Sequence, residues 1–206
     1  DDLYEAAKAL TKDGVYGFGC SATNNQAGYY NLIYDMGGYV INDDKTASGY
    51  DDPNTIKAMQ YFEKMIQEGI MPSQQTMSES AEDVLLGSGT LAMATQGSWM
   101  LSAFKENEYI AQNCDCVELP KDAASGKRVS IYNGLGWAAS ADFNLQAYLN
   151  MMDDMVIRPY SRETVTWEND VNEELKKGWT QEVTMEEACM NAAATMNETL
   201  DEENAG

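Results

Sequence analysis

The sequence contains no histidine, and this absence disfavours several kinds of chemistry at once. Histidine is the usual general base of serine and cysteine hydrolases, so enzymes of those types start at a disadvantage. A Cys-x-Cys pair with two distant cysteines could bind zinc, but its spacing is unlike that of paired zinc knuckles. Thiols in the core or near the surface are the favoured interpretation, with no metal and no cofactor. The cysteines in question are Cys20, Cys114, Cys116 and Cys189.

Basic side chains are scarce as well. Lysine and arginine together number 13 against 34 aspartate and glutamate residues, which gives a formal net charge of −21. Repulsion from so many carboxylates disfavours binding to a phosphate backbone or an anionic membrane, so we expect no nucleic-acid partner. The acidic residues are spread along the chain, which is typical of a solvated surface.

Long apolar runs are missing too. No apolar segment approaches the roughly 20 residues that span a bilayer, and no basic, apolar signal pattern precedes Asp1. The sequence does not begin with methionine, so we expect a mature or trimmed product. Its 206 residues, 44% of them hydrophobic, are enough for one compact domain with a core.

The order of the expected elements predicts an α/β fold. Helical faces alternate with strand-like runs through residues 1–141, and the clearest helix begins with Asp52 as its cap and Pro53 at its first position. Residues 142–206 are expected to be helical, with a face that runs from Leu145 to Val156 and a frayed end from Asp201. The expected strands are 15–19, 39–41, 90–95, 116–119 and 129–139, the last two joined as a hairpin by a turn at 123–126.

The stretch from Gly87 to Met100 predicts a helix end, a buried strand and a new helix that opens on a tryptophan. Gly97 and Ser98 offer a flexible turn with a capping hydroxyl. Trp99 would then follow the carboxyl end of a strand, where ligands bind in open α/β sheets. The alternative is a tryptophan that only packs.

Six segments in order resemble the extracellular solute-binding proteins of bacterial ABC importers, above all the sugar-binding group that includes maltose-binding protein. The resemblance covers most of the chain and implies one lobe of the type II periplasmic-binding-protein fold, with a mixed sheet flanked by helices and a helical C-terminal third. The segments are Tyr16–Gly19, Tyr34–Tyr39, Gly87–Met93, Gln96–Trp99, Val117–Pro120 and Gly134–Ser140.

Family members are longer, and two segments of their first lobe have no counterpart here, one before Asp1 and one near Ala141 and Asp142. The resemblance therefore implies that residues 1–206 are a single second lobe, whether engineered, trimmed or an excerpt. It implies capture of a sugar or oligosaccharide for ABC permease subunits, with the missing first lobe as a partner. It also implies a surface lipoprotein in Gram-positive bacteria or a periplasmic protein in Gram-negative bacteria.

Sugar sites combine an aromatic face with planar amides and carboxylates. By resemblance, the loop before the second helix lies at the cleft, Trp99 matches a cleft tryptophan, and Trp167 approximately matches a second one. Arg162 and Glu163 could bind hydroxyl groups or form a surface ion pair. For the other candidate residues, the alternative is a structural role, either in a polar turn that caps the following helix or as a side chain that only packs. The full candidate set is Asn24, Asn25, Gln26, Tyr29, Tyr30, Trp99, Asn133, Arg162, Glu163 and Trp167.

Two other functions remain open on the sequence. One is a carbohydrate-active enzyme, because Glu118, Glu163 and Glu168 could supply a carboxylate pair, although nothing in the sequence pairs them. The other is a surface domain of the same fold that binds protein. A binding protein without catalytic residues is the favoured interpretation.

Overall fold

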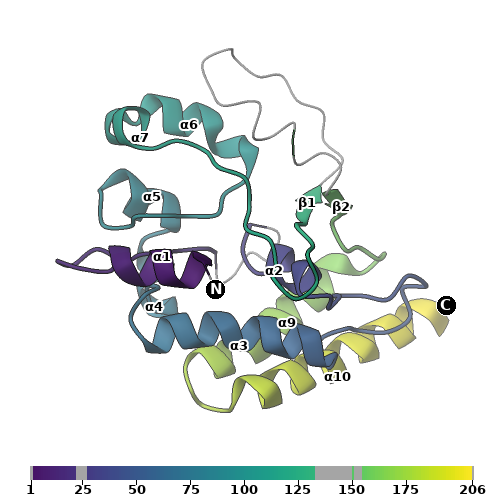
Figure 1. Cartoon of the computed structure of the whole chain (residues 1–206). Coiled ribbons are helices and arrows are strands. Elements are labelled where there is room, and N and C mark those ends of the chain that lie inside the picture. The colour runs from purple at the N-terminus through teal and green to yellow at the C-terminus, as the bar shows by residue number, and fades with distance from the viewer. Residues whose placement is uncertain (1, 22–26, 133–149, 151–154, 206) are drawn as a thin grey trace.

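Three helices, α3 (Pro53–Gln67), α9 (Thr164–Trp179) and α10 (Met185–Ala205), lie together along the base of the molecule in Figure 1. This computed structural model describes residues 2–21, 27–132, 150 and 155–205. The remaining helices and the short strands lie above this base. The fold is helix-rich and mixed α/β with a helical C-terminal part, as the sequence predicts.

Helix α3 forms where its start and stop signals predict. The Asp52 carboxylate accepts hydrogen bonds from the backbone N–H groups of Asn54 and Thr55, at 2.8 and 3.2 Å, and Pro53 occupies the first turn. Gly69 follows the helix end with a φ of +69°, a conformation that glycine adopts without steric cost. The buried stripe of α3 includes Ala58, Met59, Phe62 and Met65, as its apolar periodicity predicts.

The C-terminal helices α9 and α10 contribute a large part of the core. The Thr184 hydroxyl accepts a hydrogen bond from the Glu187 N–H at 3.1 Å, which is one half of the predicted capping box. Helix α10 continues to Ala205, so the frayed end expected from Asp201 is wrong. Its predicted inward residues are all buried, namely Met185, Ala188, Cys189, Ala192, Met196 and Leu200.

The two described strands pair in parallel. Strand β1 (Ser130–Tyr132) pairs with β2 (Met155–Ile157), and single bridges join Tyr16 to Leu91 and Gly19 to Ala94. The expected hairpin is wrong, because residues 116–119 form no strand and β1 takes β2 as its partner instead. Val156 therefore lies in a strand and not at the end of a helix, while residues 145–149 and 151–154 lie outside the described part.

Helix α4 precedes the helix that is expected to begin at Ser80, and it was not predicted. The expected helix forms as α5, two residues later than expected, because Ser80 has an extended backbone between α4 and α5. The helix expected from Trp99 is a 3₁₀ turn that continues into α6, and α7 follows without having been predicted. The remaining bounds are α1 (Asp2–Leu10), α2 (Tyr30–Asp35), α4 (Gln74–Glu79), α5 (Glu82–Gly87), η1 (Ser98–Met100), α6 (Leu101–Glu106) and α7 (Glu108–Asn113).

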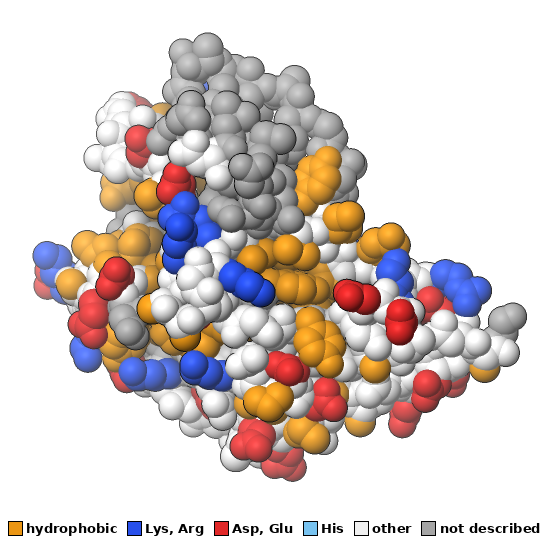
Figure 2. Space-filling view, turned by 45° about the vertical axis from the view of Figure 1, so that its right-hand side comes forward, with side chains coloured by type: hydrophobic (Ala, Val, Ile, Leu, Met, Phe, Trp, Pro, Cys, Tyr) orange, Lys and Arg blue, Asp and Glu red, His pale blue; other side chains and the backbone are white. Residues whose placement is uncertain are grey.

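One large apolar cluster joins α2, α3, α9 and α10, and a smaller one lies around Leu86, Leu91 and Ile110. None of the described helices combines the length and apolar character that crossing a bilayer requires. Figure 2 shows acidic side chains dispersed over the visible face, in line with the expected solvated surface.

Candidate functional site

The site begins where two short parallel segments end side by side. The N–H groups of Tyr16 and Gly19 donate to the carbonyls of Thr90 and Met93, both at 2.9 Å. The two segments run in the same direction, so the chain leaves both at the same edge. Carboxyl ends of parallel strands are where α/β sheets bind ligands. The turn that carries Trp99 leaves one segment there, and the loop toward α2 leaves the other.

Trp99 is the exposed aromatic of this turn. It lies in η1, and 48% of its surface is accessible. Its indole ring packs over Gly97, since a β-carbon at that glycine would lie only 2.0 Å from Cζ3 of the ring. Gly97 has a φ of −84°, so this position requires glycine for space and not for backbone conformation. Gly97 is also the N-cap, so the capping hydroxyl expected from Ser98 is not found.

Hydrogen bonds hold the turn on both sides of Gly97. The Thr95 N–H donates to the Gly19 carbonyl at 3.2 Å, and the Thr95 hydroxyl donates to the Ala27 carbonyl at 2.8 Å. The Gly97 carbonyl accepts from the Met100 N–H at 3.0 Å, which closes the 3₁₀ turn. Trp99 is thus presented by a segment with a fixed backbone.

The side chain of Gln96 bridges this turn to the start of α5. Its Nε2 donates to Glu82 Oε1 at 2.7 Å, and its Oε1 accepts from the Gly97 N–H at 3.0 Å. Glu82 is only 7% exposed, and burial raises the pKa of its carboxyl above the ordinary value. Neither residue was predicted as part of the site. A glutamine before a Gly-Ser-Trp turn is visible in the sequence, but no pattern there indicates its carboxylate partner fourteen residues earlier.

Three predicted site residues lie in the core. Tyr29 is 1% exposed and its hydroxyl donates to Asn172 Oδ1 at 3.1 Å, while Tyr30 is fully buried. Trp167 is fully buried too, and its Nε1 donates to the Ser161 hydroxyl at 3.0 Å. These side chains have no surface to offer a ligand in this structure, because α2 and α9 turn them toward the base helices. We therefore leave them out of the proposed site.

Arg162 and Glu163 lie in the exposed loop before α9. Arg162 forms the surface ion pair that the sequence left open, and its partner is Glu203 of α10 at 3.6 Å. Glu163 accepts from the Thr166 hydroxyl at 3.1 Å. Both side chains are exposed and accessible to a ligand. The loop follows the end of β2, which pairs in parallel with β1.

The other predicted residues, Asn24, Asn25, Gln26 and Asn133, lie outside the described part of the chain. Of the candidate residues that the structure describes, only Trp99 lies at the parallel edge formed by residues 16–19 and 91–94. Arg162 and Glu163 follow the second parallel pair, β1 and β2.

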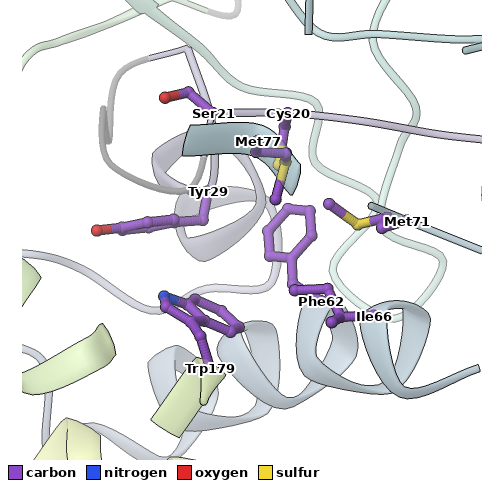
Figure 3. A pocket seen from close by; sticks show the side chains of 8 residues that line it. All are labelled: Cys20, Ser21, Tyr29, Phe62, Ile66, Met71, Met77 and Trp179. Carbon is purple, nitrogen blue, oxygen red and sulfur yellow. The ribbon is translucent and has the colours of Figure 1, made fainter. Parts of the chain in front are cut away.

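A small cavity beneath this region is not a sugar site. It has a volume of about 10 Å³, which is room for a single water molecule. Figure 3 shows Tyr29 and Trp179 on one side and Phe62 with Met71 on the other. The lining is almost entirely apolar, and this space is a packing defect of the core.

The cysteines show no metal-binding arrangement. All four are free thiols, and Cys20 and Cys189 are buried. Burial raises the pKa of the Cys189 thiol to about 12, which keeps it protonated. Within the part of the chain that the structure describes, no three cysteine or carboxylate side chains stand close enough to hold a metal ion.

Glu118, Glu163 and Glu168 are the three carboxylates that could have formed a catalytic pair. Each of them accepts a hydrogen bond from a side chain that is not a carboxylate. Glu118 accepts hydrogen bonds from Asn150 and Arg128, both at 2.7 Å, and these lower the pKa of its carboxyl. Glu168 accepts from Arg158 at 2.5 to 2.6 Å. Carboxylates bound to arginine are poor general acids, because the charged form is stabilised.

No protein-family model matches this sequence, and no curated protein matches it. Solved structures do. An ABC substrate-binding protein of Listeria monocytogenes in complex with cycloalternan superposes with a TM-score of 0.83 at 18% identity. The cyclic α-maltosyl-1,6-maltose binding protein of Arthrobacter globiformis gives 0.75 at 16% identity, and the maltose/maltodextrin-binding domain of Bdellovibrio bacteriovorus, bound to maltotriose, gives 0.71 at 14%.

Each superposition covers 97% of this chain but only 63 to 66% of the other protein. The sequence resemblance is thereby confirmed at the level of the fold, including its partial extent. The chain has the periplasmic-binding-protein-like fold of maltodextrin-type solute-binding proteins, over somewhat less than two thirds of their length.

Proposed function

We propose that this chain is the second lobe of a solute-binding protein that captures a sugar or oligosaccharide for an ABC permease. The observation that carries the proposal is Trp99, an exposed aromatic on a fixed turn at the carboxyl edge of two parallel segments. An indole face packs well on the C–H patches of a pyranose ring, and this contact needs a rigid, accessible ring. Three neighbours of the same fold bind cycloalternan, cyclic α-maltosyl-1,6-maltose and maltotriose, respectively.

Arg162 and Glu163 complete the proposed site as donors and acceptors for sugar hydroxyls. Both are exposed, and the loop that holds them is fixed to α10 through Glu203. Asn24, Asn25, Gln26 and Asn133 remain proposed contacts on the resemblance alone. No catalytic step is proposed. Delivery to permease subunits, the missing first lobe as a partner and an extracellular or periplasmic location belong to the same proposal.

The proposal is tested by titrating the chain with maltotriose and with cycloalternan while NMR spectra of the chain record the binding. We expect saturable binding without release of reducing sugar, and at least about a fivefold loss of affinity in Trp99→Ala, since a desolvated aromatic contact contributes about 1 kcal/mol or more. Tyr109→Ala is the matched control, because Tyr109 is an aromatic of similar exposure, 45%, on α7.

Unchanged affinity in Trp99→Ala would overturn the site. Release of reducing sugar from a glycan panel would favour the enzyme, and absence of binding to any sugar would favour the protein-binding alternative.

A further inference from the structure

The turn that carries Trp99 contains a half-buried side-chain bridge that no feature of the proposed site requires. Gln96 uses both ends of its amide, one toward Glu82 and one toward the Gly97 N–H. A glutamine on a surface turn is normally free to rotate. Here both of its hydrogen-bonding groups are engaged, and its side chain is half-buried.

We propose that Gln96, anchored by Glu82, is a positioning residue that sets the orientation of the Trp99 ring for ligand binding. The proposal rests on the proposed function of Trp99 as the aromatic contact. Neither Gln96 nor Glu82 is assigned a contact with the ligand; both act through the backbone of Gly97.

The geometry links the bridge to the ring in one short step. The Gly97 N–H is fixed by the Gln96 amide, and the Gly97 carbonyl is fixed by the Met100 N–H. With both backbone groups engaged, the peptide planes on either side of Gly97 have little freedom to rotate. The indole ring of Trp99 packs against Gly97, so a rotation of those peptide planes would move the surface on which the ring packs.

Glu82 gives the bridge its anchor. It is the first residue of α5 and 7% exposed, and the hydrogen-bond partner of its Oε1 is the neutral amide of Gln96. A buried carboxylate costs free energy unless it is hydrogen-bonded, so the Gln96 Nε2 donor is strongly favoured in this position. If the Gln96 amide rotated so that its oxygen and nitrogen exchanged places, its oxygen would face the Glu82 carboxylate without a donor between them. Glu82 thereby also fixes which end of Gln96 meets Gly97.

Exchange of the two side chains tests this arrangement. Gln96→Glu keeps an acceptor for the Gly97 N–H but removes the donor to Glu82 and places two carboxylates together. In the double variant Glu82→Gln/Gln96→Glu, the introduced amide at position 82 donates to the introduced carboxylate at position 96. Both hydrogen bonds and the net charge of the wild type are then restored.

The readout is the ¹⁹F NMR signal of Trp99 in the 5-fluorotryptophan-labelled chain, assigned by its loss in Trp99→Phe. We expect Gln96→Glu to shift or broaden this signal, while the signals of the buried Trp167 and Trp179 stay in place as internal controls for folding. The double variant should return the Trp99 signal to its wild-type position. Maltotriose affinity should fall about fivefold in the single variant, the range expected for one lost hydrogen bond, and recover in the double variant.

A wild-type Trp99 signal in Gln96→Glu, or a double variant without recovery, would overturn the proposal. The signal is measured without ligand, so it decides the positioning role independently of sugar binding. A chain whose Trp99 signal responds as expected but which binds no sugar would contradict the proposed function and leave the bridge in place. Thermal unfolding of each variant separates a local change in the turn from a general loss of stability.

Discussion

Glu203, near the end of α10, joins the last helix to the loop that precedes α9. Its carboxylate accepts from the Ser161 hydroxyl at 2.7 Å and from the N–H groups of Arg162 and Glu163 at 3.0 Å. Burial alone would raise the pKa of this carboxyl, but the three hydrogen bonds and the Arg162 charge outweigh it and lower the pKa. The charged form is therefore the one that stabilises the fold.

We predict that Glu203→Gln lowers the melting temperature near pH 7, because an amide cannot accept all of these hydrogen bonds. A carboxyl with a lowered folded-state pKa contributes stability above its unfolded pKa and loses that contribution as the pH falls through the folded value. The difference between wild type and variant should therefore be constant from about pH 6 upward and disappear in acid. Thermal unfolding from pH 3 to 8 measures it, and a difference at pH 3 as large as that at pH 7 would contradict the assignment.

At the level of single residues, the sequence indicated an exposed tryptophan, whereas three other aromatics of the candidate set are buried. Trp99 follows a Gly-Ser pair after a short strand, and local pattern is enough to find such a turn. Trp167 and Tyr29 also stand beside polar loops, yet their helices rotate them into the core. Which face of a helix is buried depends on the neighbouring helix, and in a polar, aromatic-rich segment the apolar periodicity does not decide it.

At the level of elements, the packing of α9 against α10 is unusually close at one point. A β-carbon at Gly178 would lie 2.9 Å from Met185 Cε and 3.0 Å from Ala188 Cβ. The glycine therefore lets the end of α9 approach the start of α10. Further along α10, Met196 is fully buried in the main core, whereas Met190 on the same helix is 49% exposed.

We predict that Met196→Ala destabilises the chain by about 2 to 4 kcal/mol, because it removes buried apolar surface and leaves a cavity. Met190→Ala makes the same chemical change on the outer face of the same helix and should cost less than about 0.5 kcal/mol. Urea unfolding followed by circular dichroism gives both values. Equal losses in the two variants would show that α10 does not pack as described.

Among the elements, the well-capped helices were predictable, and the pairing of the strands was not. Helix α3 has a cap, a proline at its start and a clear apolar stripe, and α10 has a capping threonine and seven buried residues. Strand β1 lies within the expected strand 129–139, and the bridged residues 16, 19, 91 and 94 lie within the expected strands 15–19 and 90–95. The pairing of β1 with β2 also joins residues far apart in the sequence, a contact that turn signals cannot indicate.

For the whole molecule, several apolar side chains near the end of β2 remain exposed. Ile157 is 65% exposed and Val165 72%, and Lys45 lies 3.2 Å from the centroid of the exposed Tyr160 ring. The matched solute-binding proteins are longer than this chain. In the proposed function, the missing lobe would supply the opposite wall of the cleft, so the contacts of Trp99, Arg162 and Glu163 would be only part of the full set.

The affinity of the chain for a sugar should reflect this incomplete set of contacts. A ligand enclosed between two lobes contacts protein on both faces, whereas a ligand on one lobe keeps much of its surface in water and still loses its translational freedom. We therefore predict that the chain binds maltotriose with a dissociation constant of about 1 mM, near −4 kcal/mol. Titration calorimetry on the chain measures this value, with Trp99→Ala as the reference for non-specific binding. A micromolar constant that is lost in Trp99→Ala would show that one lobe is sufficient, and that closure contributes little to capture.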